Sequence, residues 1–220
     1  MDGLTPEFLR TGLLFYILLF SCLVLRTFAQ AWLADRLGDP TPRDEGRVTL
    51  YPVPHIDLLG TVILPLICIF VLSAGTGINF FLAWTNPVPI NPANFGKPQR
   101  DYLFTQLSSC GMSVLLGFGS AVVGALLYRF DPRAQDVVVM MIRINAMLIV
   151  LDLLPIPPLP GGLLLKHFGF ISEERYWMIS RWSGLAFMIA INIPPIAKGL
   201  GLLIQLAALP FGIVYSLIVR

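Results

Sequence analysis

Apolar residues gather in six long runs, and the segments between the runs are polar or rich in proline and glycine. The first run is long enough to cross about 30 Å of hydrocarbon with some tilt. It follows Thr5, Pro6 and Glu7, a capping residue and two residues suited to a first helical turn. The pattern predicts an all-α membrane protein of about six transmembrane helices. The expected spans are residues 8–34, 58–84, 102–128, 137–154, 182–197 and 200–219.

Three connections add detail to this pattern. Residues 47–51 alternate between polar and apolar before Pro52, which predicts a short β-hairpin or strand segment after the first helix. Residues 153–162 are proline-rich and follow an apolar run directly. Irregular backbone at membrane depth is tolerated only where protein or a water cavity surrounds it, so this loop is expected to be buried against helices. Lys198 and Gly199 separate the last two runs and predict a close helical hairpin.

Composition supports a membrane protein. The chain is 56% hydrophobic and 13% charged, whereas soluble domains are about 25% charged. We therefore expect one integral membrane domain over residues 1–220. The net charge of +2 and the lack of a basic tract argue against nucleic acid as a partner. Cys22, Cys68 and Cys110 lie in apolar runs, which is typical of small core residues. Lys and Arg are too evenly spread to predict the orientation.

Three polar residues interrupt the first apolar run. Arg26, Thr27 and Gln30 have the spacing of the zinc motif H-E-x-x-H, in which two histidines bind the metal and the glutamate is the general base. Arginine offers only donors and a permanent positive charge. Threonine cannot act as a carboxylate base, and a glutamine amide is a poor zinc ligand beside imidazole. The segment thus has the spacing of an active site without its chemistry.

Several segments, in the correct order, resemble the site-2 protease family of intramembrane zinc metallopeptidases, in its short form without a PDZ domain. They are residues 33–42, His55-Ile56-Asp57 with the following L-G-T, Trp84 with residues 87–92, and L-L-P-I-P-P-L at 153–159. The resemblance spans residues 25–162. It implies a site-2 protease-like core at about residues 8–162 and an additional C-terminal helical hairpin at 163–220. It also implies a multi-pass protein of a bacterial inner membrane, cytoplasmic or intracytoplasmic.

The resemblance assigns positions to the missing chemistry. Arg26 and Gln30 stand where the family has its zinc-binding histidines, Thr27 where it has the glutamate, and Pro160 where it has an aspartate ligand. This implies a catalytically degenerate member, a pseudoprotease with no bound metal and no cofactor. Such a protein would be a structural or binding subunit of a larger membrane complex, with the lipid bilayer and other membrane subunits as partners. The alternative is an active intramembrane metallopeptidase that cleaves transmembrane segments.

Two sets of residues are expected to replace the lost site. Arg26, Gln30 and Asp152 are expected to form a polar network, because a buried arginine needs a partner and Asp152 replaces a family asparagine. Alternatively, Arg26 reaches backbone in the proline-rich loop and Asp152 caps its own turn. His55 is expected to hydrogen-bond within its loop rather than join Asp57 in a new metal site. The candidate binding segment is expected to be extended, near residues 155–162, and covered by the chain itself or by a partner. It consists of Asn86, Pro87, Val88, Pro89, Ile90, Asn91 and Pro92.

Overall fold

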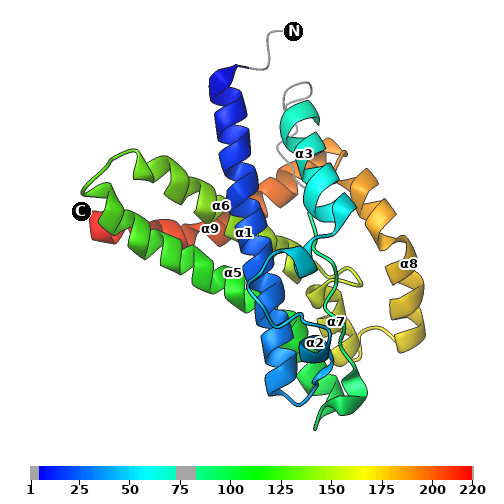
Figure 1. Ribbon diagram of the computed structural model, residues 1–220. Helices are drawn as coiled ribbons and strands as arrows, with labels where there is room; N and C mark the ends of the chain where they lie inside the picture. The colour runs from blue at the N-terminus through cyan, green and yellow to red at the C-terminus, as the bar shows by residue number, and fades with distance from the viewer. Residues whose placement is uncertain (1–4, 73–82, 220) are drawn as a thin grey trace. The chain divides into compact units, whose positions relative to one another are not determined.

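The computed structural model describes residues 5–72 and 83–219, which are helical over most of their length (Figure 1). The chain divides into two compact units, Met1–Asn91 and Pro92–Arg220. The first unit begins with the long helix α1 (Pro6–Arg36), which Thr5 caps by accepting a hydrogen bond from the Phe8 amide at 3.1 Å. The short elements α2 (Thr41–Asp44) and η1 (Val53–His55) follow. A continuous helical stretch then comprises η2 (Leu58–Ile63), α3 (Leu64–Ile67) and η3 (Cys68–Leu72).

The expected strand at residues 47–51 is wrong, because the described part of the chain contains no strand. There, side chains make hydrogen bonds to backbone groups that a partner strand would otherwise bond. The Thr49 carbonyl lies 2.8 Å from His55 Nε2, and the Thr49 hydroxyl accepts a bond from the Tyr51 amide at 3.1 Å. Local bonds of this kind fold the backbone into a bend. Alternation of polar and apolar residues alone did not distinguish the two outcomes.

The second apolar run begins with η2, a π-helix, whose turns are wider than those of an α-helix. Asp57 caps it by accepting a bond from the Gly60 amide at 2.6 Å. Pro65 lies inside the stretch, and a proline has no N–H for the carbonyl four residues earlier, which its ring also displaces. That carbonyl belongs to Thr61, and it accepts a bond from the Tyr16 hydroxyl of α1 at 3.2 Å. The wide turns of η2 and η3 flank the proline, as expected where the regular hydrogen-bond ladder is interrupted.

The second unit contains one short turn and five helices within its described residues. These are η4 (Pro92–Asn94), α5 (Pro98–Tyr128), α6 (Ala134–Leu153), α7 (Pro160–His167), α8 (Glu173–Ala190) and α9 (Pro194–Val219). Helices α5, α6 and α9 pack on one another (Figure 1) around Ala121, Val138, Ile142, Ala146 and Phe211. The expected break at Lys198 and Gly199 is instead at residues 191–193, because Pro194 cannot continue α8 but suits the first turn of α9.

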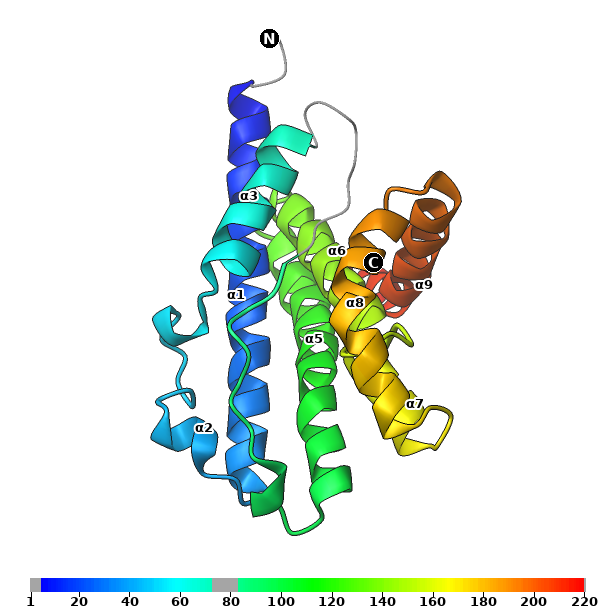
Figure 2. The same ribbon diagram turned by 90° about the vertical axis from the view of Figure 1, so that its right-hand side faces the viewer.

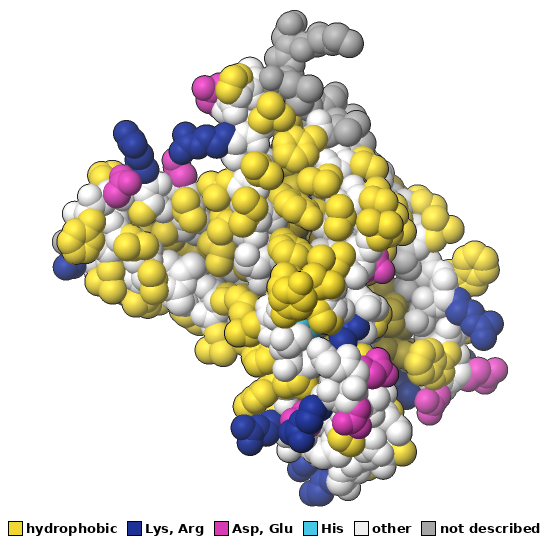
Figure 3. Space-filling view, in the orientation of Figure 1, with side chains coloured by type: hydrophobic (Ala, Val, Ile, Leu, Met, Phe, Trp, Pro, Cys, Tyr) yellow, Lys and Arg dark blue, Asp and Glu magenta, His cyan; other side chains and the backbone are white. Residues whose placement is uncertain are grey.

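The expectation of six spans is also corrected. Among the residues that the structure describes, three helices are long and apolar enough to cross a membrane: α1, α5 and α9. The shorter helix α6 carries Asp136, Arg143 and Asp152, and α8 carries four charged residues. Part of the expected second span, residues 73–82, lies outside the described residues. Hydrophobic side chains cover much of the face seen in Figure 3. These features indicate a membrane protein.

Candidate functional site

The site predicted on α1 lies in the C-terminal half of that helix. Arg26 and Thr27 are buried, with exposed fractions of 8% and 5%, and Gln30 is half-buried one turn later. The Thr27 hydroxyl is 2.8 Å from the Leu23 carbonyl and 2.8 Å from the Thr85 hydroxyl. Thr27, which stands at the position of the family's general base, is therefore hydrogen-bonded within the same chain.

Thr85 belongs to an extended segment, residues 83–91, which runs along α1 (Figure 2). Its first residues are fixed to the start of η2. The Trp84 amide donates to the Gly60 carbonyl at 3.1 Å, and the Thr61 hydroxyl donates to the Trp84 carbonyl at 2.8 Å. A Cβ on Gly60 would lie 2.3 Å from the Trp84 indole, so the close approach requires glycine.

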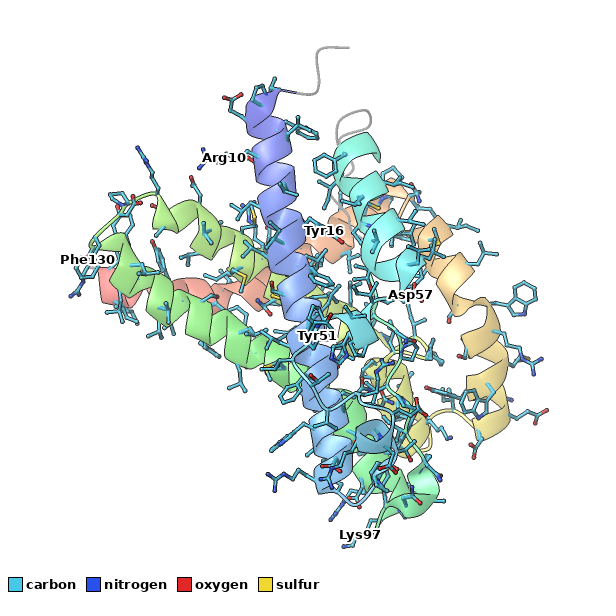
Figure 4. All side chains as sticks on the ribbon, viewed as in Figure 1. Arg10, Tyr16, Tyr51, Asp57, Lys97 and Phe130 are labelled. Atoms are coloured by element: carbon cyan, nitrogen blue, oxygen red, sulfur yellow. The ribbon has the colours of Figure 1, made fainter. Side chains whose placement is uncertain are left out.

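The middle of the extended segment is held by Arg47 and His55. Arg47 Nη2 donates to the carbonyls of Asn86 and Pro87 at 2.5 and 3.1 Å, and the Asn86 amide donates to the His55 carbonyl at 2.9 Å. Figure 4 labels Tyr51 and Asp57, which lie on either side of His55 in the sequence. Arg47 therefore replaces the partner strand that an extended segment would otherwise need.

His55 is fully buried and neutral. Because a carbonyl only accepts, His55 Nε2 carries the proton shared with the Thr49 carbonyl. Burial lowers the pKa of His55; the bond to Thr49 opposes this, and the nearby Arg47 guanidinium adds to the lowering. Burial likewise lowers the pKa of Arg47, while Glu45 raises it. His55 Nδ1 has no hydrogen-bond partner within the described residues.

The far end of the segment is held by Asp39, which is fully buried just after α1. Its carboxylate accepts bonds from the Asn91 amide at 2.7 Å and from the Thr41 hydroxyl at 2.6 Å. Pro92 leaves the extended conformation and opens η4. Sequence reasoning named residues 86–92 as a candidate binding segment, a role that stays a prediction, and missed Asp39 and Arg47, which hydrogen-bond to its backbone, and Thr85, which bonds Thr27. The Asp-Pro-Thr sequence after the helix was a usable signal, since aspartate often bonds the backbone two residues later.

The remaining predicted residues lie in the second unit. Asp152 is 8% exposed in the last turn of α6, and the Ser109 hydroxyl of α5 lies 3.1 Å from its Oδ2. Pro160 is buried in the first turn of α7. A Cβ on the next residue, Gly161, would lie 2.3 Å from the Leu154 carbonyl oxygen, so the proline-rich loop folds tightly onto the helix start. The network with Arg26 joins residues of different units and stays a prediction.

The residues at the zinc-motif positions do not fit a zinc ion. The expected donor set would be two imidazoles and a carboxylate, whereas the chain offers a guanidinium, an amide and a proline at Arg26, Gln30 and Pro160. Within residues 5–72 and 83–219, no group of three or more His, Cys, Asp or Glu residues could hold a metal ion.

Comparison with known proteins finds one informative relative. The chain is 28% identical over 153 residues to a Bacillus subtilis (strain 168) protein named "Putative zinc metalloprotease YwhC". The match covers 66% of this chain and 64% of the relative, so the chain spans less than two thirds of that protein. No family model matches the chain, and no solved structure matches it. The similarity suggests a site-2 protease-like membrane protein.

Proposed function

We propose that this chain is a non-catalytic, site-2 protease-like membrane protein that serves as a subunit of a larger membrane complex. The observation that carries the proposal is the environment of Thr27. Its hydroxyl stands at the position of the family's general base and is bonded to Leu23 and Thr85. A general base must accept a proton from water near the reacting atom, and an alcohol has no basicity suited to that step near pH 7.

The charge on Arg26 supports the same proposal. Zinc catalysis depends on neutral imidazole and anionic carboxylate ligands, which stabilise a dication and lower the pKa of its bound water. A permanently protonated guanidinium at a ligand position repels a dication instead. Arg26 is 8% exposed, so water screens this repulsion little. At two ligand positions and at the base position, all on one helix, the residues are thus ones that do not support metal chemistry.

The extended segment supports a structural role. An unwound substrate could pair with such a segment only through backbone groups that the protein leaves available. Here the amides of Trp84, Asn86 and Asn91 and the carbonyls of Trp84, Asn86 and Pro87 already bond within the chain. The segment thus acts as part of the protein's own framework.

Helix α9 supports a place among lipids and other membrane subunits. Only 6% of its most apolar window is buried within the chain. One face is made of exposed large aliphatic residues at helical spacing: Leu202, Leu206, Leu209, Ile213 and Leu217. The opposite face, with Phe211, packs on the core of the second unit. In a bilayer such a face contacts lipid tails or helices of other proteins.

A cleavage assay tests the non-catalytic part. The purified chain in detergent is incubated with a transmembrane peptide substrate, with and without a zinc chelator, beside a Thr27→Ala variant. We expect the same background cleavage in all samples. Cleavage by the unmodified chain that the chelator abolishes and Thr27→Ala loses would overturn the proposal.

The subunit part has its own test. The chain is extracted from its native membrane in mild detergent, and the mass of the particle is measured. A particle of fixed mass well above one chain, with partners in constant ratio, is expected. A particle that contains this chain alone contradicts the subunit role but leaves the catalytic question untouched.

The alternative is an active intramembrane metallopeptidase, and the name of the Bacillus relative is the observation in its favour. That activity would require a second donor set outside residues 26–30. His55 is the histidine nearest to α1 in the sequence, and its Nε2 proton is engaged by the Thr49 carbonyl. We therefore favour the non-catalytic function.

A further inference from the structure

The second unit has an open pocket of about 480 Å³ where α5 begins and α7 ends. It is lined by Lys97, Pro98, Gln99, Arg100 and His167, so two cationic side chains from the start of α5 and a histidine from the end of α7 come to it, and no acidic residue lines it. Figure 4 labels Lys97 in the turn before α5. Within the described part of the chain, the Lys97 ammonium makes no ion pair. Asp101 offsets only one of the two cations Lys97 and Arg100, so the pocket presents a net positive charge.

Arg100, which lines this pocket, is held by Asp101. Asp101, whose side chain is only 4% exposed, accepts from Arg100 Nε at 2.8 Å and from Arg100 Nη2 at 2.6 Å. The Arg100 side chain is itself 48% exposed. A guanidinium has five N–H donors in a fixed plane, so these two contacts hold the plane and leave three donors for another acceptor.

The surroundings of the pocket are those of a membrane interface. Two exposed aromatic rings contact its lining residues: Phe104, which is 49% exposed, lies by Arg100, and Phe168, which is 67% exposed, lies 5.4 Å from the His167 ring. Arg100 lies over the Phe104 ring at 5.7 Å. Aromatic rings beside basic side chains are typical of the headgroup level of a bilayer. The candidate span α5 starts at Pro98, so the pocket lies at the end of a membrane-crossing helix, where lipid phosphates are.

We propose that this pocket binds the phosphate of an anionic phospholipid headgroup. Lys97 and Arg100 contact the phosphate oxygens, and His167 closes the side of the pocket formed by α7. The neighbouring Lys166 is not part of the site, because it does not line the pocket. Basic pockets between membrane helices bind anionic headgroups in this way. The inference is independent of whether the chain cleaves peptides.

Lipid titration tests the proposal. The purified chain in detergent is titrated with short-chain phosphatidylglycerol or phosphatidylcholine of the same tails, and bound lipid is counted by native mass spectrometry. We expect one phosphatidylglycerol to bind more tightly than any phosphatidylcholine. Lys97→Gln should weaken phosphatidylglycerol binding about fivefold, the equivalent of about 1 kcal/mol for one cation at the surface.

Lys198→Gln is the matched control, because Lys198 is an exposed lysine in α9 that does not line the pocket. It should leave the affinity unchanged, and both variants should keep the unfolding temperature of the unmodified chain. Equal affinity for the two lipids, or an equal loss in both variants, would overturn the site. If inorganic phosphate displaces the lipid at equal concentration, the pocket binds a free ion and the assignment to a lipid is wrong.

Discussion

Thr27 and Arg26 are two neighbouring side chains of α1 whose chemistry bears on whether this helix can support zinc catalysis. A glutamate at position 27 would bring a charge that needs a metal-bound water to act on. The threonine brings a hydroxyl that two nearby oxygens satisfy, one in its own helix and one in the extended segment. These neighbouring buried positions thus carry a hydroxyl that is bonded within the chain and a permanently charged guanidinium.

His55 gives a residue-scale prediction about pH. Its pKa is lowered in the folded chain, chiefly by burial, whereas in the unfolded chain it is about 6.5. Above that pH both states are neutral, and below it the unfolded state binds a proton first. Stability should therefore fall as the pH is lowered from about 6.5 towards the folded pKa, by at most about 1.4 kcal/mol per pH unit for one proton. Thermal unfolding in detergent, followed by tryptophan fluorescence, measures it.

His55→Gln is the matching variant, because its amide can still donate to the Thr49 carbonyl but does not titrate in this range. Carboxylates elsewhere titrate in both proteins and cancel in the comparison. The difference in unfolding temperature between the two proteins should shrink as the pH is lowered. If both lose stability in parallel, His55 is not the group responsible.

At the scale of elements, long apolar runs predicted helices well where end signals agreed with them. The first helix begins after Thr5 as expected. Helix α5 ends at Tyr128 as expected but begins at Pro98, four residues before the expected start at residue 102. The prediction of a strand at residues 47–51 is wrong because backbone groups there are hydrogen-bonded to His55 and to the Thr49 side chain. The break before the last helix lies at residues 191–193 and not at Lys198 and Gly199, because Pro194 and Pro195 form the first turn of α9. Prolines start helices more readily than they interrupt them.

The packing of α5 on α6 gives a prediction at this scale. A Cβ on Gly124 would lie 2.0 Å from Val138 Cγ2, and valine, branched at Cβ, cannot easily move aside. Gly124→Ala should therefore destabilise the chain by about 1–3 kcal/mol, the usual cost of overpacking.

Gly119→Ala on the same helix is the control, because nothing lies within 4 Å of its added Cβ. It should be neutral or should stabilise by up to about 1 kcal/mol through helix propensity. Thermal unfolding of the two variants side by side measures the difference. Equal midpoints would mean that α5 and α6 do not pack as described.

For the whole molecule, sequence reasoning located the positions with zinc-motif spacing but not the contacts that surround them. Arg26, Thr27 and Gln30 could be read from spacing within one helix. Arg47 and Thr85 could not, because their partners are 39 to 58 residues away in the sequence. The Asp-Pro-Thr turn signals the local bonds of Asp39, but not its bond to Asn91, which is 52 residues away. Such pairings depend on how the chain returns along α1, and local patterns carry no record of them.

The zinc content of the purified chain tests the central claim most directly. The protein is incubated with zinc, dialysed against zinc-free buffer and analysed by inductively coupled plasma mass spectrometry. The comparator is a variant with Arg26→His, Thr27→Glu, Gln30→His and Pro160→Asp, which restores the expected donor set. We predict far less than one zinc per unmodified chain and more zinc in the restored variant. One tightly held zinc per unmodified chain, lost in Gln30→Ala, would contradict the account.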